Sequence, residues 1–370
     1  MARGETVIPE ADRLLDFAHP RETFSFVGHA DAEAAVLDAW NSGKMHHAWL
    51  ITGPQGVGKA TLAYRMARFL MANPVQELGA KDTLHVAPDH PAAKFVTALS
   101  HPDLFVLRRP YDEKTKKLKT GIPVAEVRKV AGFFSTHASH GGWRIVIVDA
   151  ADDMDNSAAN ALLKVLEEPP KQTILILVSH SPGRLLPTIR SRCRKLALNA
   201  LSTDEIAEVL SANGHALKSQ DAAAVAALAD GSAGEALALA AGGGLDLYKQ
   251  VEGVLGALPS PDIKALYKLA DAVAKRGADD MWRAGQDMMI RWTGRVARTI
   301  ALGEPGPDII VGEGSRMLRI AEGTSPAAWA DAWNQLAQDF ARGEGLNMDR
   351  KQVFLNAVFT LQGIARDKAA

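Results

Sequence analysis

The chain has 370 residues, 47% of them hydrophobic and 23% charged, with a formal net charge of −1 at pH 7. Such a length accommodates two or three domains, and the near-neutral charge excludes a globally basic nucleic-acid-binding protein. The single cysteine, Cys193, excludes a disulfide framework and a cysteine-rich zinc module, which favours a reducing cytoplasm. No apolar run reaches about 18 residues, so we expect no membrane span. The N-terminal residues also lack the apolar core of a signal peptide.

Up to about residue 200, short apolar runs alternate with amphipathic stretches. Residues 47–52, 144–149 and 174–178 are predicted as buried strands, and 61–72 and 156–168 as helices. Continuous apolar runs suit strands that are covered on both faces. The alternation predicts a parallel sheet with crossover helices.

The segment 112–120 is predicted as a charged loop. Solvated surface is one interpretation, and a surface that faces DNA or a partner protein is the other. The near-neutral charge of the chain predicts weak, salt-sensitive DNA binding in isolation. The densest basic stretch comprises Arg108, Arg109, Lys114, Lys116, Lys117 and Lys119.

Beyond residue 200 the pattern becomes helical. Ser202 and Glu205 form a capping-box signature, alanine-rich helical sequence runs to Ala241, and the glycines 242–244 mark a break. Helical spacing then continues to the end of the chain. We therefore predict an α/β domain over 1–199, a small helical domain over 200–243 and a larger helical domain over 244–370.

Two amphipathic segments near the carboxyl end carry tryptophans. These residues suit either a monomer core or a subunit interface, and the core is the default interpretation. The four tryptophans are Trp282, Trp292, Trp329 and Trp333.

A phosphate-binding loop lies between the first predicted strand and the next helix. In Gly53-Pro-Gln-Gly-Val-Gly-Lys59, the glycines let backbone N–H groups approach phosphate oxygens. Gly53, Gly56, Val57 and Gly58 are the candidate binding positions, and Lys59 would meet the β- and γ-phosphates. The helix N-terminus that follows adds a favourable dipole.

The residue after this lysine departs from a working site. A P-loop ATPase places a Mg²⁺-binding hydroxyl there, and this chain has Ala60. Thr61 is one residue further, which rotates its side chain by roughly 100° around a helix. Binding of ATP or ADP and an inert loop that only caps a helix both stay open.

The acidic end of the second strand is also incomplete. Asp149 stands where the metal-orienting acid of a Walker B motif belongs, but Ala150 replaces the glutamate that polarises water. Asp152 is three positions further and is not expected to substitute. Because positioning and charge stabilisation supply nearly all phosphoryl-transfer catalysis, we expect no independent ATP hydrolysis.

Residues 149–170 (DAADDMDNSAANALLKVLEEPP) and the later Ser191-Arg192-Cys193 resemble the bacterial clamp-loader branch of the AAA+ proteins. Residues 177–190 resemble the delta-prime family of that branch in particular. The resemblance is dense from residue 19 to 198, weaker in the next segment, and thin beyond Gly244. It implies a P-loop AAA+ domain, a helical lid and a helical collar.

The resemblance also implies partners and roles. The subunit would join delta and gamma/tau subunits in a ring that places the β sliding clamp on primed DNA. Arg192 would project into the nucleotide site of the neighbouring subunit and stabilise charge there. The alternative is a surface arginine paired with a carboxylate. Cys193 is expected to be a packing residue. Gly234 occupies the lid position where motor subunits carry an arginine, although a plain helix N-terminus also explains this segment.

Many clamp-loader subunits carry a four-cysteine zinc module before the Walker B strand. Residues 71–105 contain no cysteine, only the scattered His85, His90 and His101. We therefore expect no zinc and no replacement metal site.

Three functions compete. A non-motor subunit explains Ala60, Ala150 and Gly234 together with an intact Ser-Arg-Cys motif. An active gamma/tau-type ATPase predicts a hydroxyl, a glutamate and an arginine at those three positions, and all are missing. An adaptor outside replication would have no reason to keep Arg192. The first interpretation places the chain in the DNA polymerase III holoenzyme, in the cytoplasm at the replisome.

Overall fold

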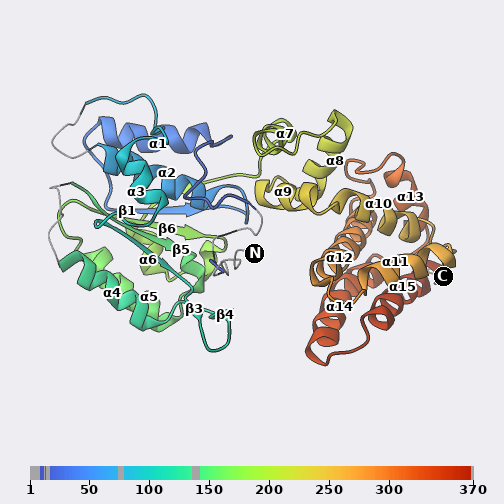
Figure 1. The fold of residues 1–370 in the computed structure, drawn as a ribbon. Helices are drawn as coiled ribbons and strands as arrows, with labels where there is room; N and C mark the ends of the chain where they lie inside the picture. Colours follow the sequence, from blue (N-terminus) through green and yellow to red (C-terminus); the bar gives the residue numbers. More distant parts are fainter. Residues whose placement is uncertain (1–8, 12, 14–16, 74–78, 136–141, 368–370) are drawn as a thin grey trace, which may run out of the picture. The chain divides into compact units, whose positions relative to one another are not determined.

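The computed structural model describes residues 9–11, 13, 17–73, 79–135 and 142–367 (Figure 1). The chain forms two compact units. One comprises residues 1–212 with 230–235, and the other comprises 213–229 with 236–370. This division crosses the predicted lid, so the boundaries of the three-domain scheme stay a prediction.

The first unit is built on a parallel five-stranded sheet with strand order β2-β5-β6-β1-β7. Alternate residues of each strand enter different cores: Ile145 and Ile147 of β5 pack on one face, Val146 and Val148 on the other. Every residue of β5 is buried, which explains its continuous apolar run. The strands are β1 Ala48–Thr52, β2 Leu104–Arg108, β5 Arg144–Asp149, β6 Thr173–Ser179 and β7 Arg194–Ala197.

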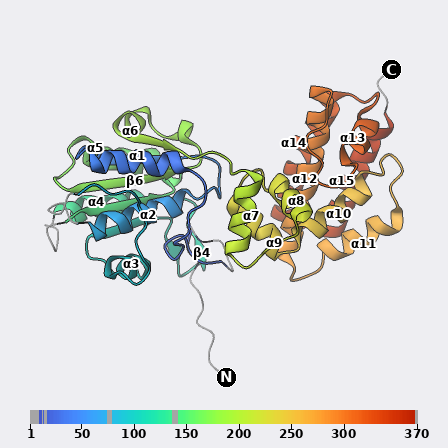
Figure 2. The same cartoon turned by 90° about the horizontal axis from the view of Figure 1, so that it is seen from above.

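Helices cover both faces of this sheet, as Figures 1 and 2 show. The predicted parallel sheet with crossover helices is therefore confirmed. The helix predicted from Thr61 begins earlier, at Lys59, because Gly58 takes a left-handed conformation as its N-cap. One face carries α1 Ala30–Asn41, α2 Lys59–Ala72 and α3 Pro91–Thr97, and the other carries α4 Val124–Ser135, α5 Asn156–Glu167 and α6 Pro187–Arg192.

The charged segment predicted as a loop contains a small antiparallel hairpin, so that prediction was wrong in part. Its strands are β3 Tyr111–Asp112 and β4 Lys117–Leu118. The Asp112 carboxylate accepts hydrogen bonds from the N–H groups of Lys114 (2.9 Å) and Thr115 (3.1 Å) and so shapes the turn. The sequence does not single out this turn, because the aspartate that shapes it is one of many charged residues in the segment.

The six basic residues of this region divide into two groups. Arg108 forms an ion pair with Glu10, and the Nε atom of Arg109 lies 3.0 Å from a carboxylate oxygen of Asp153. The four lysines on and beside the hairpin are exposed. Only the lysines therefore present their charge to solvent.

The capping box is confirmed, since Ser202 and Glu205 exchange hydrogen bonds at the start of α7 Thr203–Ala212. The break predicted at the glycines 242–244 is confirmed for Gly242 and Gly243, which separate α9 Ala233–Ala241 from α10 Gly244–Leu255, whereas Gly244 begins α10. No helix among the described residues is long and apolar enough to span a membrane. The remaining helices are α8 Ser219–Ala229, α10 Gly244–Leu255, α11 Ile263–Val273, α12 Asp279–Leu302, α13 Glu313–Ala321, α14 Pro326–Gly345 and α15 Arg350–Arg366.

Three of the four carboxyl-end tryptophans form the core of the second unit. Trp282, Trp292 and Trp329 are at most 1% exposed, whereas Trp333 is 46% exposed and packs its edge beside Gly294. The default prediction of a core role is confirmed for the first three.

Candidate functional site

The phosphate loop joins β1 to α2 and depends on glycine at two close approaches. Gly53 has φ +147°, and a Cβ there would lie 2.3 Å from the carbonyl oxygen of Leu198. Gly56 has φ +76°, and a Cβ there would lie 2.2 Å from the hydroxyl of Ser232. Side chains are therefore excluded at both positions.

Lys59 is only 3% exposed and turns toward its own loop. Its Nζ donates hydrogen bonds to the carbonyl oxygens of Gly53 (2.8 Å) and Pro54. Burial lowers the pKa of Lys59 to about 8, while the charges of Asp149 and Asp152 oppose the shift. The lysine thus has backbone partners without any phosphate.

The other predicted residues of the loop and helix have different environments. Val57 buries its side chain in the core, and its carbonyl oxygen lies 3.0 Å from Nε2 of His29. Ala60 and Thr61 follow Lys59 in the first turn of α2 and are both partly exposed. The second helical residue therefore offers no hydroxyl, and a role for Thr61 stays a prediction.

Asp149 ends β5 as predicted and is 5% exposed, and the buried Ala150 follows it. Asp152 lies in the short 3₁₀ helix η2 Ala151–Asp153. Its carboxylate accepts hydrogen bonds from the Ser179 hydroxyl (2.8 Å) and from the backbone N–H groups of His180 and Ser181. These oxygens already have donors, in agreement with the expectation that Asp152 does not replace the missing glutamate.

The polar pair Ser179 and His180 ends the third predicted strand, but sequence reasoning gave it no role in the site. Burial lowers the pKa of His180, and the charge of Lys59 adds to the shift. The available signal was a polar pair that directly follows an apolar strand, because parallel strands end at a common edge.

The base of the lid contacts the phosphate loop through backbone atoms. The N–H of Gly234 donates a 2.9 Å hydrogen bond to the carbonyl oxygen of Gly56. A Cβ on Gly234 would lie 3.3 Å from the Gly56 Cα, so a side chain there crowds the loop. The Ser232 hydroxyl accepts a hydrogen bond from the N–H of Glu235 (3.2 Å), which fits the simpler interpretation of a helix N-terminus.

Arg192 ends α6, and its side chain is 35% exposed. One guanidinium nitrogen lies 2.8 Å from a carboxylate oxygen of Glu167, and another donates to the carbonyl oxygen of Thr188 at 3.1 Å. Within the described residues, no hydrogen bond or ion pair joins Arg192 to the phosphate loop. Burial raises the pKa of the neighbouring Cys193 thiol to about 12, and that side chain packs against the core.

The scattered histidines serve local structure. Nδ1 of His90 accepts a hydrogen bond from the Ala92 N–H at the start of α3, and Nδ1 of His101 accepts one from the Asp103 N–H, whereas His85 is exposed. Where the chain is described, no group of three or more histidine, cysteine or acidic side chains has a metal-binding arrangement.

The sequence of the first unit matches known proteins. Residues 29–202 match the family model described as "DNA polymerase III, delta subunit". DNA polymerase III subunit delta' of Pseudomonas aeruginosa is 42% identical over 147 residues, which are 40% of this chain and 41% of that protein. Part of this chain is therefore similar to delta and delta-prime subunits of DNA polymerase III. The chain therefore matches about two fifths of the length of this delta-prime relative.

More distant similarity extends further along the chain. DNA polymerase III subunit tau of Salmonella typhimurium is 27% identical over 274 residues, which are 70% of this chain and 39% of that protein. A solved gamma-subunit-related protein from Thermotoga maritima covers 90% of this chain and 100% of its own, at 17% identity and a TM-score of 0.37. The fold assignment depends on the observed sheet and helices and not on this loose superposition.

Proposed function

We propose that this chain is a non-motor subunit of the clamp loader of bacterial DNA polymerase III. It joins delta and gamma/tau subunits in the replisome of the cytoplasm, where the ring loads the β sliding clamp on primer-template DNA. The similarity of residues 29–202 to the delta-subunit family model, and of 147 residues to a delta-prime subunit, supports the assignment. The observation that carries it is the contrast between a partly exposed Arg192 and a nucleotide site that lacks the Mg²⁺-binding hydroxyl and the water-polarising glutamate.

The nucleotide site of this chain fits phosphate binding but not hydrolysis. The glycine cradle and Lys59 match the phosphates of ATP or ADP, which would supply negative charge to the buried ammonium group. Ala60 offers no hydroxyl to Mg²⁺, and Ala150 offers no carboxylate to water. Gly234 adds no positive charge at the lid, so hydrolysis by this subunit is not expected.

Arg192 is the residue that acts on a neighbour in this proposal. An arginine supplied in trans stabilises the charge that develops on a transferring phosphoryl group. Its present ion pair with Glu167 lies between two partly exposed side chains, and such pairs contribute only about 0.2–1 kcal/mol. Release of Arg192 toward a phosphate is therefore energetically easy.

The test is ATP turnover of the reconstituted clamp loader with Arg192→Ala in this subunit. We expect turnover at the neighbouring site to fall about 10³-fold, while the complex still assembles. Single-turnover kinetics would show the affected site as a slow fraction. Arg184→Ala is the matched control, since Arg184 is an exposed arginine in the 3₁₀ helix η3 Pro182–Arg184.

The same experiment separates the alternative functions. The isolated chain should show no ATP hydrolysis. If it hydrolyses ATP, and Arg192→Ala leaves the complex unchanged, the active gamma/tau-type motor is the better assignment. A chain that joins no clamp-loader complex at all would favour the adaptor.

A further inference from the structure

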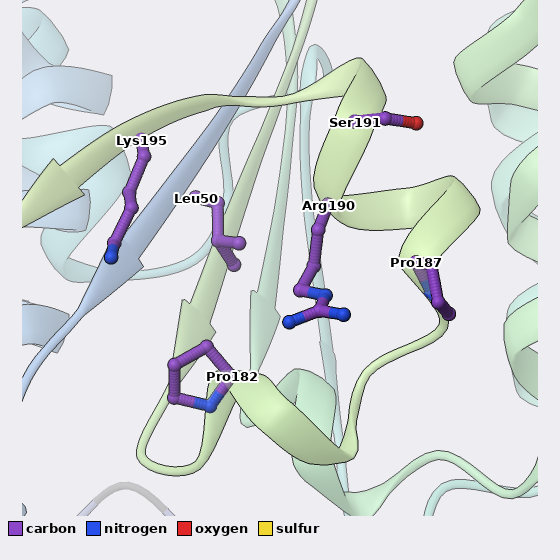
Figure 3. Close-up of a pocket in the computed structure, with 6 residues that line it drawn as sticks. All are labelled: Leu50, Pro182, Pro187, Arg190, Ser191 and Lys195. Carbon is purple, nitrogen blue, oxygen red and sulfur yellow. The ribbon is translucent and has the colours of Figure 1, made fainter.

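A hollow of about 420 Å³ opens beside α6, on the face of the sheet that carries α4 and α5 (Figure 3). Its floor is Leu50 of β1, a side chain that is 2% exposed. The six residues that line it are Leu50, Pro182, Pro187, Arg190, Ser191 and Lys195.

The hollow follows from the topology of the first unit. β7 is an edge strand next to β1, and the segment that leads into it contains only η3 and the six-residue α6. These short elements cover the β1–β7 side of the sheet less completely than the two twelve-residue helices cover the other strands. An apolar floor with a partly open mouth results.

Two positive charges enter this hollow from different elements. Figure 3 shows Arg190 reaching in from α6 and Lys195 from β7, on either side of Leu50. Both side chains are exposed, and neither forms an ion pair with a carboxylate of the described residues. The neighbouring cations differ, because Arg192 pairs with Glu167 and Arg194 stacks on Trp49, with 4.9 Å from its guanidinium carbon to the ring centre.

A hollow with two like charges and apolar walls is complementary to a ligand that combines negative charge with an apolar group. Leu50, Pro182 and Pro187 supply the apolar contact area. An acidic protein side chain next to an aliphatic one has this combination. A nucleic-acid backbone offers the charge but no aliphatic side chain to fill the floor.

We propose that the hollow receives an acidic residue of the adjoining clamp-loader ATPase subunit, with its carboxylate between Arg190 and Lys195. This inference rests on the proposed function, since it takes the neighbour of Arg192 as its partner. Ser191 lines the hollow and directly precedes Arg192. Seating of the acidic residue would therefore fix the segment that presents the guanidinium to the neighbouring nucleotide site.

The first test measures binding of the full chain to the gamma/tau-type subunit at about 0.1 M salt, where surface charges are only partly screened. Arg190→Glu and Lys195→Glu should each weaken binding at least about 10-fold, because each places like charges opposite one another at the interface. Lys171→Glu is the matched control, since Lys171 is exposed and precedes the opposite, amino end of β6. Equal affinities for the hollow variants and this control would overturn the proposal.

A charge-reversal rescue identifies the contact. Exposed acidic residues of the partner are changed one at a time to lysine, and one of them should restore binding to Lys195→Glu. Absence of any rescue, with thermal melting showing that Lys195→Glu is folded, would count against a single acidic contact. If the hollow variants lose affinity for primed DNA and keep affinity for the subunit, the occupant is nucleic acid and the proposal is wrong.

The two proposals fail separately. Arg192→Ala is read by turnover in an assembled complex, whereas Arg190→Glu and Lys195→Glu are read by subunit affinity. A normal turnover in Arg192→Ala together with weak binding of Lys195→Glu would reject the trans-arginine role and keep the hollow as an interface. Reduced turnover with unchanged affinities would do the reverse.

Discussion

The phosphate loop and the α6–β7 segment adjoin the same sheet, but their charged side chains differ in exposure and in their partners. At the loop, Lys59 donates to backbone carbonyl groups and Gly56 accepts from the lid. On α6–β7, Arg190 and Lys195 are exposed, and Arg192 contacts a partly exposed carboxylate. The comparison teaches that the charged group of the phosphate loop is paired internally, whereas the basic side chains of the α6–β7 segment reach solvent.

The largest expected effect is that of Gly53→Ala, which adds a side chain to the phosphate loop. The new methyl group would meet a backbone carbonyl at 2.3 Å in a conformation that alanine avoids. We expect the free energy of unfolding of the first unit to fall by about 3 kcal/mol or more. Urea unfolding measures this change.

Gly183→Ala is the control for that substitution. No heavy atom lies within 4 Å of a Cβ at position 183, so the change should be within about 0.5 kcal/mol of zero. If Gly53→Ala is equally neutral, the close packing of the phosphate loop is not a source of stability.

A smaller effect is expected for the buried charge of Lys59. Its folded pKa is about 8, below the ordinary value of about 10.4, so between these values the unfolded chain binds more protons. The free energy of unfolding of the wild type should therefore rise with pH in this window, relative to Lys59→Met, by about 2 kcal/mol. Urea unfolding of both proteins at pH 8 and pH 10 measures the difference.

A constant difference at the two pH values would show that Lys59 is solvated in the folded chain. Added ATP should reduce the pH dependence if phosphate binds, because a bound anion raises the pKa of the lysine. Sodium chloride at the same ionic strength controls for screening.

The smallest effect is expected for Glu167→Gln, which removes the carboxylate that pairs with Arg192. The pair with Arg192 is partly exposed, so stability should change by less than about 1 kcal/mol. Turnover of the reconstituted complex should change by no more than a few-fold, since only a weak ion pair is removed. A loss as large as that of Arg192→Ala would instead make Glu167 a positioning residue for the arginine.

Patterns within short segments predicted three of the five strands of the sheet (β1, β5 and β6), the helices α2 and α5, and the phosphate loop, but not β2, β7 or the other flanking helices. Residues 145–148 are apolar at every position because both faces of the strand are covered, and the glycines of the loop have fixed spacing. The helix over 156–168 was predicted to within one residue because Pro169 and Pro170 end it. Such features depend on residues that are close together in the sequence, so one sequence is enough to predict them.

Features that depend on distant residues could not be predicted. Arg190 and Lys195 share a hollow with Leu50, which lies far from them in sequence and meets them only through the pairing of β1 with β7. The contact of Asp152 with Ser179 likewise requires two adjacent strand ends. The turn at Asp112 was missed for a different reason, because a local carboxylate contact was hidden among charged residues.

The hydrogen bond between Gly234 and Gly56 limits which residues can occupy position 234. A Cβ on Gly234 would lie 3.3 Å from the Gly56 Cα, so a side chain there requires the two backbones to separate slightly. An arginine at position 234 would therefore require a small shift of the phosphate loop. A positive charge at position 234 is consequently coupled to the geometry of the phosphate loop.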